Sequence, residues 1–213
     1  MFLQPHDIAR NIEWLQRSAS PAARYLTHRD MLHADPDSDI MRQLWREVEA
    51  DPAVKGVFSL QLPNGAWFSG GPWGPRGYKR QTGEGYTATR PKFVTTAWIL
   101  PFLGEIGYRA DDPRIRKAAD LVMAELPVDG LPTDCCGLEG IALLSLSSIG
   151  LALDPRLTPA WNRLLHAQRP DGGWLNPFHL ADSKSPCTTK GRWPWNRSCA
   201  WGSYYAARAL HAA

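Results

Sequence analysis

Four cysteines and one aspartate stand where they could build a metal or thiol site. Cys135 and Cys136 directly follow Asp134 at the start of an apolar segment with helical spacing, and Cys199 opens another such segment. A helix N-terminus favours the thiolate, and thiolates joined by aspartate or histidine are typical Zn²⁺ ligands. The candidate ligands are Cys135, Cys136, Cys187 and Cys199, with His179 as a further one. The chain has no C-x-x-C pair, so spacing does not indicate a zinc finger, and the ordinary alternative is four packed cysteines.

Two long loops combine basic and aromatic side chains, which together could hold an anion. Residues 69–92 carry five basic side chains against one acidic, and residues 175–197 carry four against one. The loops therefore hold +7 of charge, and the rest of the chain holds −4, because the whole chain is +3. The candidate contacts are Trp73, Arg76, Lys79, Arg80, Lys190, Arg192, Trp193, Trp195 and Arg197. Focused positive potential beside aromatic walls fits an amphipathic anion. The alternative is a pair of routine solvated loops.

Helical periodicity dominates the segments that must position these residues, and alternating strand patterns are absent. Helical spacing covers residues 7–17, 21–32, 39–50, 94–106, 113–126, 138–149, 159–168 and 199–210. Glycine and proline separate these segments at turns such as Asp112-Pro113 and Asp154-Pro155. We therefore expect an all-α fold.

An internal repeat organises these helices. The pattern Q-x3-G-x-W occurs at Gln61–Trp67 and at Gln168–Trp174, 107 residues apart. Each copy precedes one of the two loops and then a helix with an Ala-Trp pair, whose Trp98 and Trp201 we expect in the core. The helix–turn–helix pattern of residues 94–126 also recurs in residues 137–168, with an Asp-Pro turn in each. The sequence thus predicts about two and a half helix–turn–helix units after a helical N-terminal third.

The motif Gln168–Trp174, read QRPDGGW, resembles the QW motif of terpene (squalene–hopene) cyclases and protein prenyltransferase β-subunits. The resemblance covers residues 53–213, with residues 1–52 as an N-terminal helical extension of a single domain. It implies an α/α toroid in which the Gln and Trp are scaffold residues. A full ring needs about twice this length, so we expect a partial toroid, a horseshoe of repeats.

The resemblance also implies a place for the chemistry, because equivalent helix starts in a toroid point to one rim. There the thiols and both basic loops would meet. Prenyltransferase β-subunits bind zinc through an Asp-x-Cys element, which Asp134 and Cys136 match. The later histidine ligand is missing, so Cys199 or Cys187 would replace it.

Asp134 has two further interpretations. Squalene-cyclase-type enzymes use an Asp-x-Asp-Asp acid, of which Asp134 alone remains, so ordinary class II cyclisation is not expected. Alternatively, Asp134 is the N-cap of the following helix, a role compatible with metal binding.

The first functional hypothesis is an enzyme-like protein that binds an isoprenoid diphosphate or another lipid-like anion, with zinc as cofactor. The second is a non-catalytic half-toroid that binds a lipid or a protein, with structural zinc or no metal, and forms a homodimer. Nucleic acid is a third and less favoured partner, since a net charge of +3 is low for a dedicated binder.

The composition of the chain excludes some classes of protein. With 44% hydrophobic and 21% charged residues among 213, the chain is not broadly disordered. No apolar stretch is long enough to span a membrane. The N-terminus lacks the basic and apolar regions of a secretory signal, so we expect a cytoplasmic protein with reduced thiols.

Overall fold

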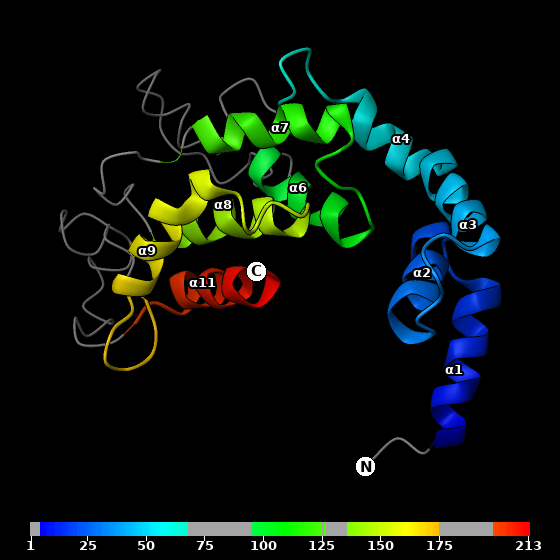
Figure 1. Ribbon diagram of the computed structural model, residues 1–213. Helices are drawn as coiled ribbons and strands as arrows, with labels where there is room; N and C mark the ends of the chain where they lie inside the picture. Colours follow the sequence, from blue (N-terminus) through cyan, green and yellow to red (C-terminus); the bar gives the residue numbers. More distant parts are fainter. Residues whose placement is uncertain (1–4, 68–94, 125, 127–135, 175–197) are drawn as a thin grey trace, which may run out of the picture. The chain divides into compact units, whose positions relative to one another are not determined.

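The computed structural model describes residues 5–67, 95–124, 126, 136–174 and 198–213, which form helices and their connecting turns (Figure 1). Apart from one isolated bridge between Gln168 and Trp174, these residues contain no β-structure. The prediction of an all-α fold is therefore confirmed for the described part of the chain. These residues fall into two compact units, Met1–Gln61 and Leu62–Ala213.

The first unit consists of helices and one π-helical turn. They are α1 (Pro5–Ser18), α2 (Pro21–Leu26), the π-helical turn η1 (Thr27–Met31), α3 (Asp39–Ala50) and α4 (Pro52–Ser59). The Ser38 side chain accepts a hydrogen bond from the Met41 amide at the start of α3, a typical N-cap. Helix α3 has the predicted bounds and buries Met41, Leu44 and Val48, whereas Ile40 is exposed.

The expected single helix over residues 21–32 changes its winding at Thr27. The hydroxyl of Thr27 donates to the carbonyl of Ala23 at 2.7 Å, and the amide of Leu32 reaches back five residues to the Thr27 carbonyl. A π-turn of this kind adds a residue to the local turn and shifts the side-chain register after it. Sequence periodicity does not reveal such a shift.

The second unit contains the predicted helix–turn–helix units. Its elements are α6 (Thr96–Glu105), α7 (Pro113–Ala124), α8 (Cys136–Ser148), the 3-10 turn η3 (Pro155–Leu157), α9 (Thr158–His166) and α11 (Ala200–Ala212). Helix α8 lies in the centre and packs against α6, α7, α9 and α11.

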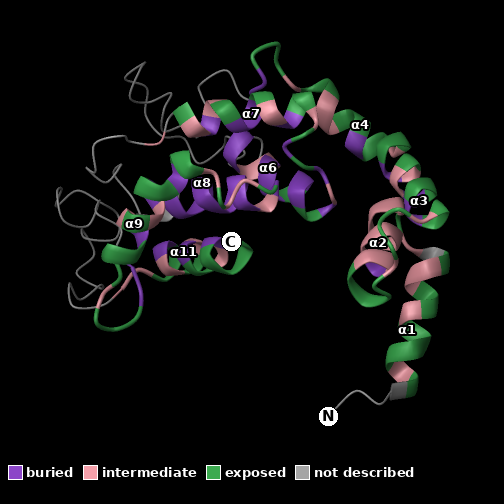
Figure 2. Ribbon diagram, in the orientation of Figure 1, coloured by how far each residue is buried: buried purple, intermediate pink, exposed green. Residues whose placement is uncertain are grey.

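The helices of the second unit differ in how many of their sides are buried (Figure 2). Residues 139–147 of α8 are all buried, because the helix is apolar on nearly every side and is covered by its four neighbours. Helix α7 instead buries one stripe, formed by Ile115, Ala118 and Val122, and exposes its charged side. The central helices α6 and α8 therefore form the core, which α7 and α9 cover with one-sided faces.

Small residues let the central helices approach closely. The hydroxyl of Ser145 on α8 donates to the carbonyl of Ala97 on α6 at 2.7 Å. A Cβ atom added at Gly140 would come within 2.9 Å of the Ala206 amide nitrogen on α11. This contact leaves no room for a larger residue at position 140, so glycine there brings α8 and α11 together.

The two helical hairpins, α6–α7 and α8–α9, share one turn geometry. The Tyr108 amide donates to the Leu103 carbonyl at 3.0 Å, and Leu151 donates to Leu146 at 2.9 Å. In the next residues, the sequence Asp-Pro-Arg occurs in both turns, where Arg114 pairs with Asp112 and Arg156 pairs with Asp154. The predicted match between residues 94–126 and residues 137–168 is thus present as repeated hydrogen bonding.

Candidate functional site

The second Q-x3-G-x-W segment is a compact turn held by its two named residues. The side-chain amide of Gln168 donates to the Gly172 carbonyl at 2.9 Å. The indole of Trp174 is 4% exposed, and its N–H donates to the Leu164 carbonyl in α9 at 2.7 Å. Both side chains therefore stabilise the turn and its junction with α9, the scaffold role expected for them.

The first copy of the segment shows the same hydrogen bonds of its backbone amides as the second. The Trp67 amide donates to the hydroxyl of Thr96 at 3.2 Å, and the Trp174 amide donates to the hydroxyl of Ser203 at 2.9 Å. Within the turns, the Leu62 amide binds the Ala66 carbonyl as Arg169 binds Gly173. Each residue of the first copy and its equivalent in the second copy are 107 positions apart in the sequence. Both turns thereby attach to the first turns of a following helix, α6 or α11.

This register corrects the alignment of the tryptophans. Thr96 is equivalent to Ser203, so the residue at the position equivalent to Trp98 is Tyr205. Trp201 lies one helical turn before that position. Trp201 is 39% exposed, so the prediction that it belongs to the core is wrong. The shared Ala-Trp dipeptide was a misleading signal, whereas the repeat distance of 107 gives the correct match.

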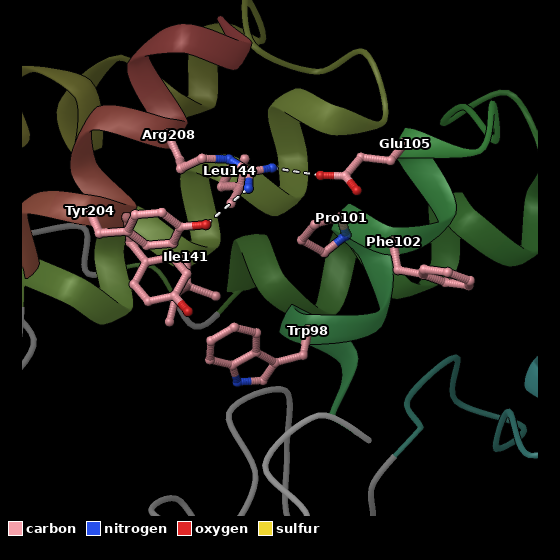
Figure 3. Close-up of a pocket in the computed structure, with 9 residues that line it drawn as sticks. Trp98, Pro101, Phe102, Glu105, Ile141, Leu144, Tyr204 and Arg208 are labelled. Atoms are coloured by element: carbon pink, nitrogen blue, oxygen red, sulfur yellow. Dashed lines mark hydrogen bonds and ion pairs between the residues drawn. The ribbon is translucent and has the colours of Figure 1, made fainter. Parts of the chain in front are cut away.

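A pocket of about 200 Å³ opens on α6, α8 and α11 (Figure 3). Its lining is formed by Trp98, Pro101, Phe102, Glu105, Ile141, Leu144, Tyr204, Tyr205 and Arg208. Most of these side chains are apolar or aromatic, and the charged ones are Glu105 and Arg208. A concave apolar site with a few polar groups is the usual form of a small-molecule site.

Aromatic rings meet nearly edge to face beside the pocket. Tyr205 is the centre of the group, with ring centroids 5.2 Å from Trp98, 5.2 Å from Trp201 and 4.9 Å from Tyr204. The interplanar angles are 84°, 70° and 81°. Such arrangements are favourable and hold the rings in fixed positions. Partial burial, together with the neighbouring Tyr204, raises the pKa of Tyr205, so its hydroxyl is neutral at physiological pH.

Arg208 links two walls of the pocket. Its guanidinium donates to the Tyr204 hydroxyl at 3.1 Å and pairs with Glu105 at 2.6 Å. These hydrogen bonds raise the pKa of Arg208 further above its ordinary value. Trp98 in the first turn of α6 meets Tyr205, whereas Glu105 at the end of α6 meets Arg208, so α6 and α11 run in the same direction.

A buried ion pair joins α8 to α9. Arg163 donates to Glu139 at 2.8 Å, and the Glu139 side chain is 4% exposed. Burial raises the pKa of the Glu139 carboxyl, and the charge and hydrogen bond of Arg163 only partly oppose this effect. Glu139 lies in the first turn of α8, three residues after Cys136.

The sequence-predicted site residues lie mostly outside the described residues. This applies to Asp134, to the arginines, lysines and tryptophans predicted as anion contacts in both basic loops, and to Cys135, Cys187 and His179. Cys136 is the first residue of α8, and Cys199 is the half-buried N-cap of α11 and is not in a disulfide. Among the described residues, no three His, Cys, Asp or Glu side chains are grouped as metal ligands.

No sequence motif marks Glu105, Tyr204, Tyr205 or Arg208 as site residues. A partial signal existed, because Tyr204 and Arg208 are four residues apart and therefore share a helix face. Their meeting with α6 depends on tertiary packing.

No protein-family model matches the chain, and a search of curated proteins finds no match. Among the described residues, no helix has both the length and the apolar character needed to cross a membrane.

Proposed function

We propose that the chain is a terpenoid cyclase- or prenyltransferase-like partial toroid that binds an amphipathic anion of the isoprenoid diphosphate type. The observation that carries the proposal is the pair of Q-x3-G-x-W turns with equivalent hydrogen bonds. Each turn attaches to a helix that lines the aromatic pocket, α6 or α11. A repeated scaffold thus presents a concave aromatic surface, which is the surface a hydrocarbon ligand needs.

The ligand would divide between two environments. Its apolar part would lie on the rings of Trp98 and Tyr205, which offer apolar surface to a hydrocarbon chain. Its diphosphate would bind the basic loops, through the arginines and lysines of residues 69–92 and 175–197. Both loops follow a Q-x3-G-x-W turn in the sequence, so the repeat gives them equivalent attachment points.

The proposed reaction centre is at the starts of α8 and α11. Asp134 immediately precedes the Cys135-Cys136 pair, and it would act as an acid or as a metal ligand. The donor set fits zinc, because Cys136 and Cys199 begin two helices that pack against each other. When bound, zinc would supply a Lewis acid or hold a thiolate. The residues Cys135, Cys187 and His179 would complete the ligand set.

The direct test is calorimetric titration of the full chain with farnesyl diphosphate. Farnesol and inorganic diphosphate serve as the separate halves of this ligand. We expect farnesyl diphosphate to bind more tightly than either half. Lys190→Gln with Arg192→Gln should weaken its binding about tenfold or more, since charged hydrogen bonds to the diphosphate are lost. Arg46→Gln, an exposed change on α3, is the control. Equal affinities for farnesol and farnesyl diphosphate would contradict the proposal.

The metal has its own test. Elemental analysis of tag-free protein should give about one zinc per chain, because the donor set supplies a single site. Cys136→Ser should reduce this content. Less than about a tenth of an equivalent, with no change in the variant, would show that the cysteines are packed thiols rather than ligands.

The second candidate is a non-catalytic half-toroid that holds a lipid or a protein chain. The exposed side chains of Phe102, Trp201 and Tyr204 around the pocket favour this alternative, since exposed aromatic clusters mark interaction surfaces. It predicts binding without turnover, stability indifferent to chelators, and a homodimer in sizing chromatography. Product formation from farnesyl diphosphate would exclude it.

A further inference from the structure

We infer that Arg208 is the anion-binding residue of the α6–α8–α11 pocket, and that Glu105 competes with the ligand for it. The ligand is a carboxylate or phosphate attached to an apolar group of about one ring. This inference rests on the proposed function for the use of the pocket as a ligand site. It differs from the proposed function because it places an anionic group inside the pocket rather than on the basic loops.

The size of the pocket sets the apolar part of the ligand. A cavity of about 150 Å³ accommodates benzene. The pocket here measures about 200 Å³, and Ile141, Leu144 and Pro101 form apolar parts of its wall. A single ring or a short branched chain therefore fits, with its faces against the aromatic side chains.

Arg208 has donors available for the anion. A guanidinium carries five N–H groups. Within the described part of the chain, the bonds of Arg208 go to the Tyr204 hydroxyl and to Glu105. The guanidinium also lies 5.9 Å from the Tyr204 ring centre, so that ring and its hydroxyl hold it in place. Arg208 is the one basic residue among the described residues that line the pocket.

The pair with Glu105 can open at small cost. The side chain of Arg208 is 41% exposed and that of Glu105 is 56% exposed. Ion pairs in such positions contribute little to stability, because water stabilises both charges when they separate. An incoming oxyanion can therefore take the place of Glu105 on Arg208, while its apolar group is removed from water in the pocket.

The same geometry disfavours a cationic ligand. The aromatic rings alone could attract a cation, but Arg208 already lies over Tyr204 and would repel a second positive charge. Glu105 neutralises Arg208 only while the pair is closed. A ligand with an oxyanion is thus the one whose charge the pocket complements.

The experiment is a calorimetric titration of the full chain with phenylacetate, benzyl phosphate and the neutral benzyl alcohol. Arg208→Gln should weaken the binding of the anions about tenfold or more, while leaving benzyl alcohol unchanged. Glu105→Gln should strengthen anion binding severalfold, because the competing carboxylate is removed. Arg156→Gln is the matched control, since the Arg156 side chain is also exposed and ion-paired but does not line the pocket.

Arg208→Gln should lower the affinity for anions and Glu105→Gln should raise it. These opposite changes separate a charge effect from damage to the fold, which would lower the affinity in both variants. Equal loss of anion and alcohol binding in Arg208→Gln would overturn the inference, as would weaker anion binding in Glu105→Gln. Binding of phenylacetate alone would identify a carboxylate ligand, and binding of benzyl phosphate alone a phosphate. Loss of anion binding in Arg208→Gln supports this inference even if farnesyl diphosphate does not bind. If farnesyl diphosphate binds through Lys190 and Arg192 but Arg208→Gln changes no anion affinity, this inference alone fails.

Discussion

Trp174 combines burial with a directed hydrogen bond, and the two can be separated by substitution. Trp174→Phe keeps an aromatic ring in the turn but removes the N–H that binds Leu164. We expect a loss of about 1–2 kcal/mol in the free energy of unfolding, from the unmade bond and the smaller ring. Trp201→Phe, at an exposed site, should change it by less than about 0.5 kcal/mol. Urea unfolding followed by circular dichroism measures both, and equal effects would contradict the scaffold role of Trp174.

Asp154 makes stability depend on pH in the acid range. The side-chain hydrogen bond from Arg156 is the main cause that lowers the pKa of Asp154 from 3.8 to about 2. A carboxyl with a lowered pKa stabilises the fold above its unfolded pKa, and this contribution is lost as the pH falls through the folded value. Unfolding free energy should therefore fall between about pH 4 and pH 2. Asp154→Asn should flatten this part of the curve, and an unchanged slope would contradict the assignment.

At the scale of elements, the buried Glu139–Arg163 pair tests how α8 and α9 are joined. Removing one partner leaves a buried charge, so Glu139→Leu and Arg163→Met should each cost about 3 kcal/mol. The double variant should cost far less than the sum, because it leaves neither charge unpaired. Burial of Glu139 raises the pKa of its carboxyl, in keeping with a cost for leaving this charge unpaired. Chemical unfolding of the wild type, the two single variants and the double variant measures the coupling energy between Glu139 and Arg163. Additive losses of stability would contradict a coupled pair.

The two Q-x3-G-x-W turns offer a matched pair of glycines. Gly65 and Gly172 have φ values of 93° and 83°, a region that an L-residue enters at a cost of about 1–2 kcal/mol. A Cβ at Gly172 meets open space, whereas one at Gly65 would lie 2.9 Å from the Lys117 backbone. Gly172→Ala should therefore lower the unfolding free energy by about 1 kcal/mol, and Gly65→Ala by clearly more. Thermal unfolding ranks the two, and a reversed order would contradict the turn geometry.

Most helices could be predicted because their signals are local. Helix α3 follows the Ser38 cap and an apolar stripe, so its bounds match the prediction. The π-turn at Thr27 could not be predicted, because one side-chain-to-backbone bond and the packing around it decide the winding. The helical hairpins were predictable from the repeated Asp-Pro turns.

At the scale of the whole molecule, the repeat was predictable and the pocket was not. The spacing of 107 residues is visible in the sequence and recurs in the hydrogen bonds of Trp67 and Trp174. The pocket forms only where α6, α8 and α11 meet, so residues such as Glu105 and Arg208 come together from distant positions. The loops and cysteines chosen from residue types lie mainly outside the described residues, and their roles stay predictions.

Hydrogen exchange measured by mass spectrometry would locate the bound ligand on the chain without any substitution. The full chain is compared with and without saturating farnesyl diphosphate. We expect slower exchange in α6 and α11, which line the pocket, and in the basic loops of residues 69–92 and 175–197, with α1 to α3 unchanged. Unchanged exchange in α6 and α11 under saturation, or protection confined to α1 to α3, would contradict the proposal that this chain binds an amphipathic anion on its repeat helices.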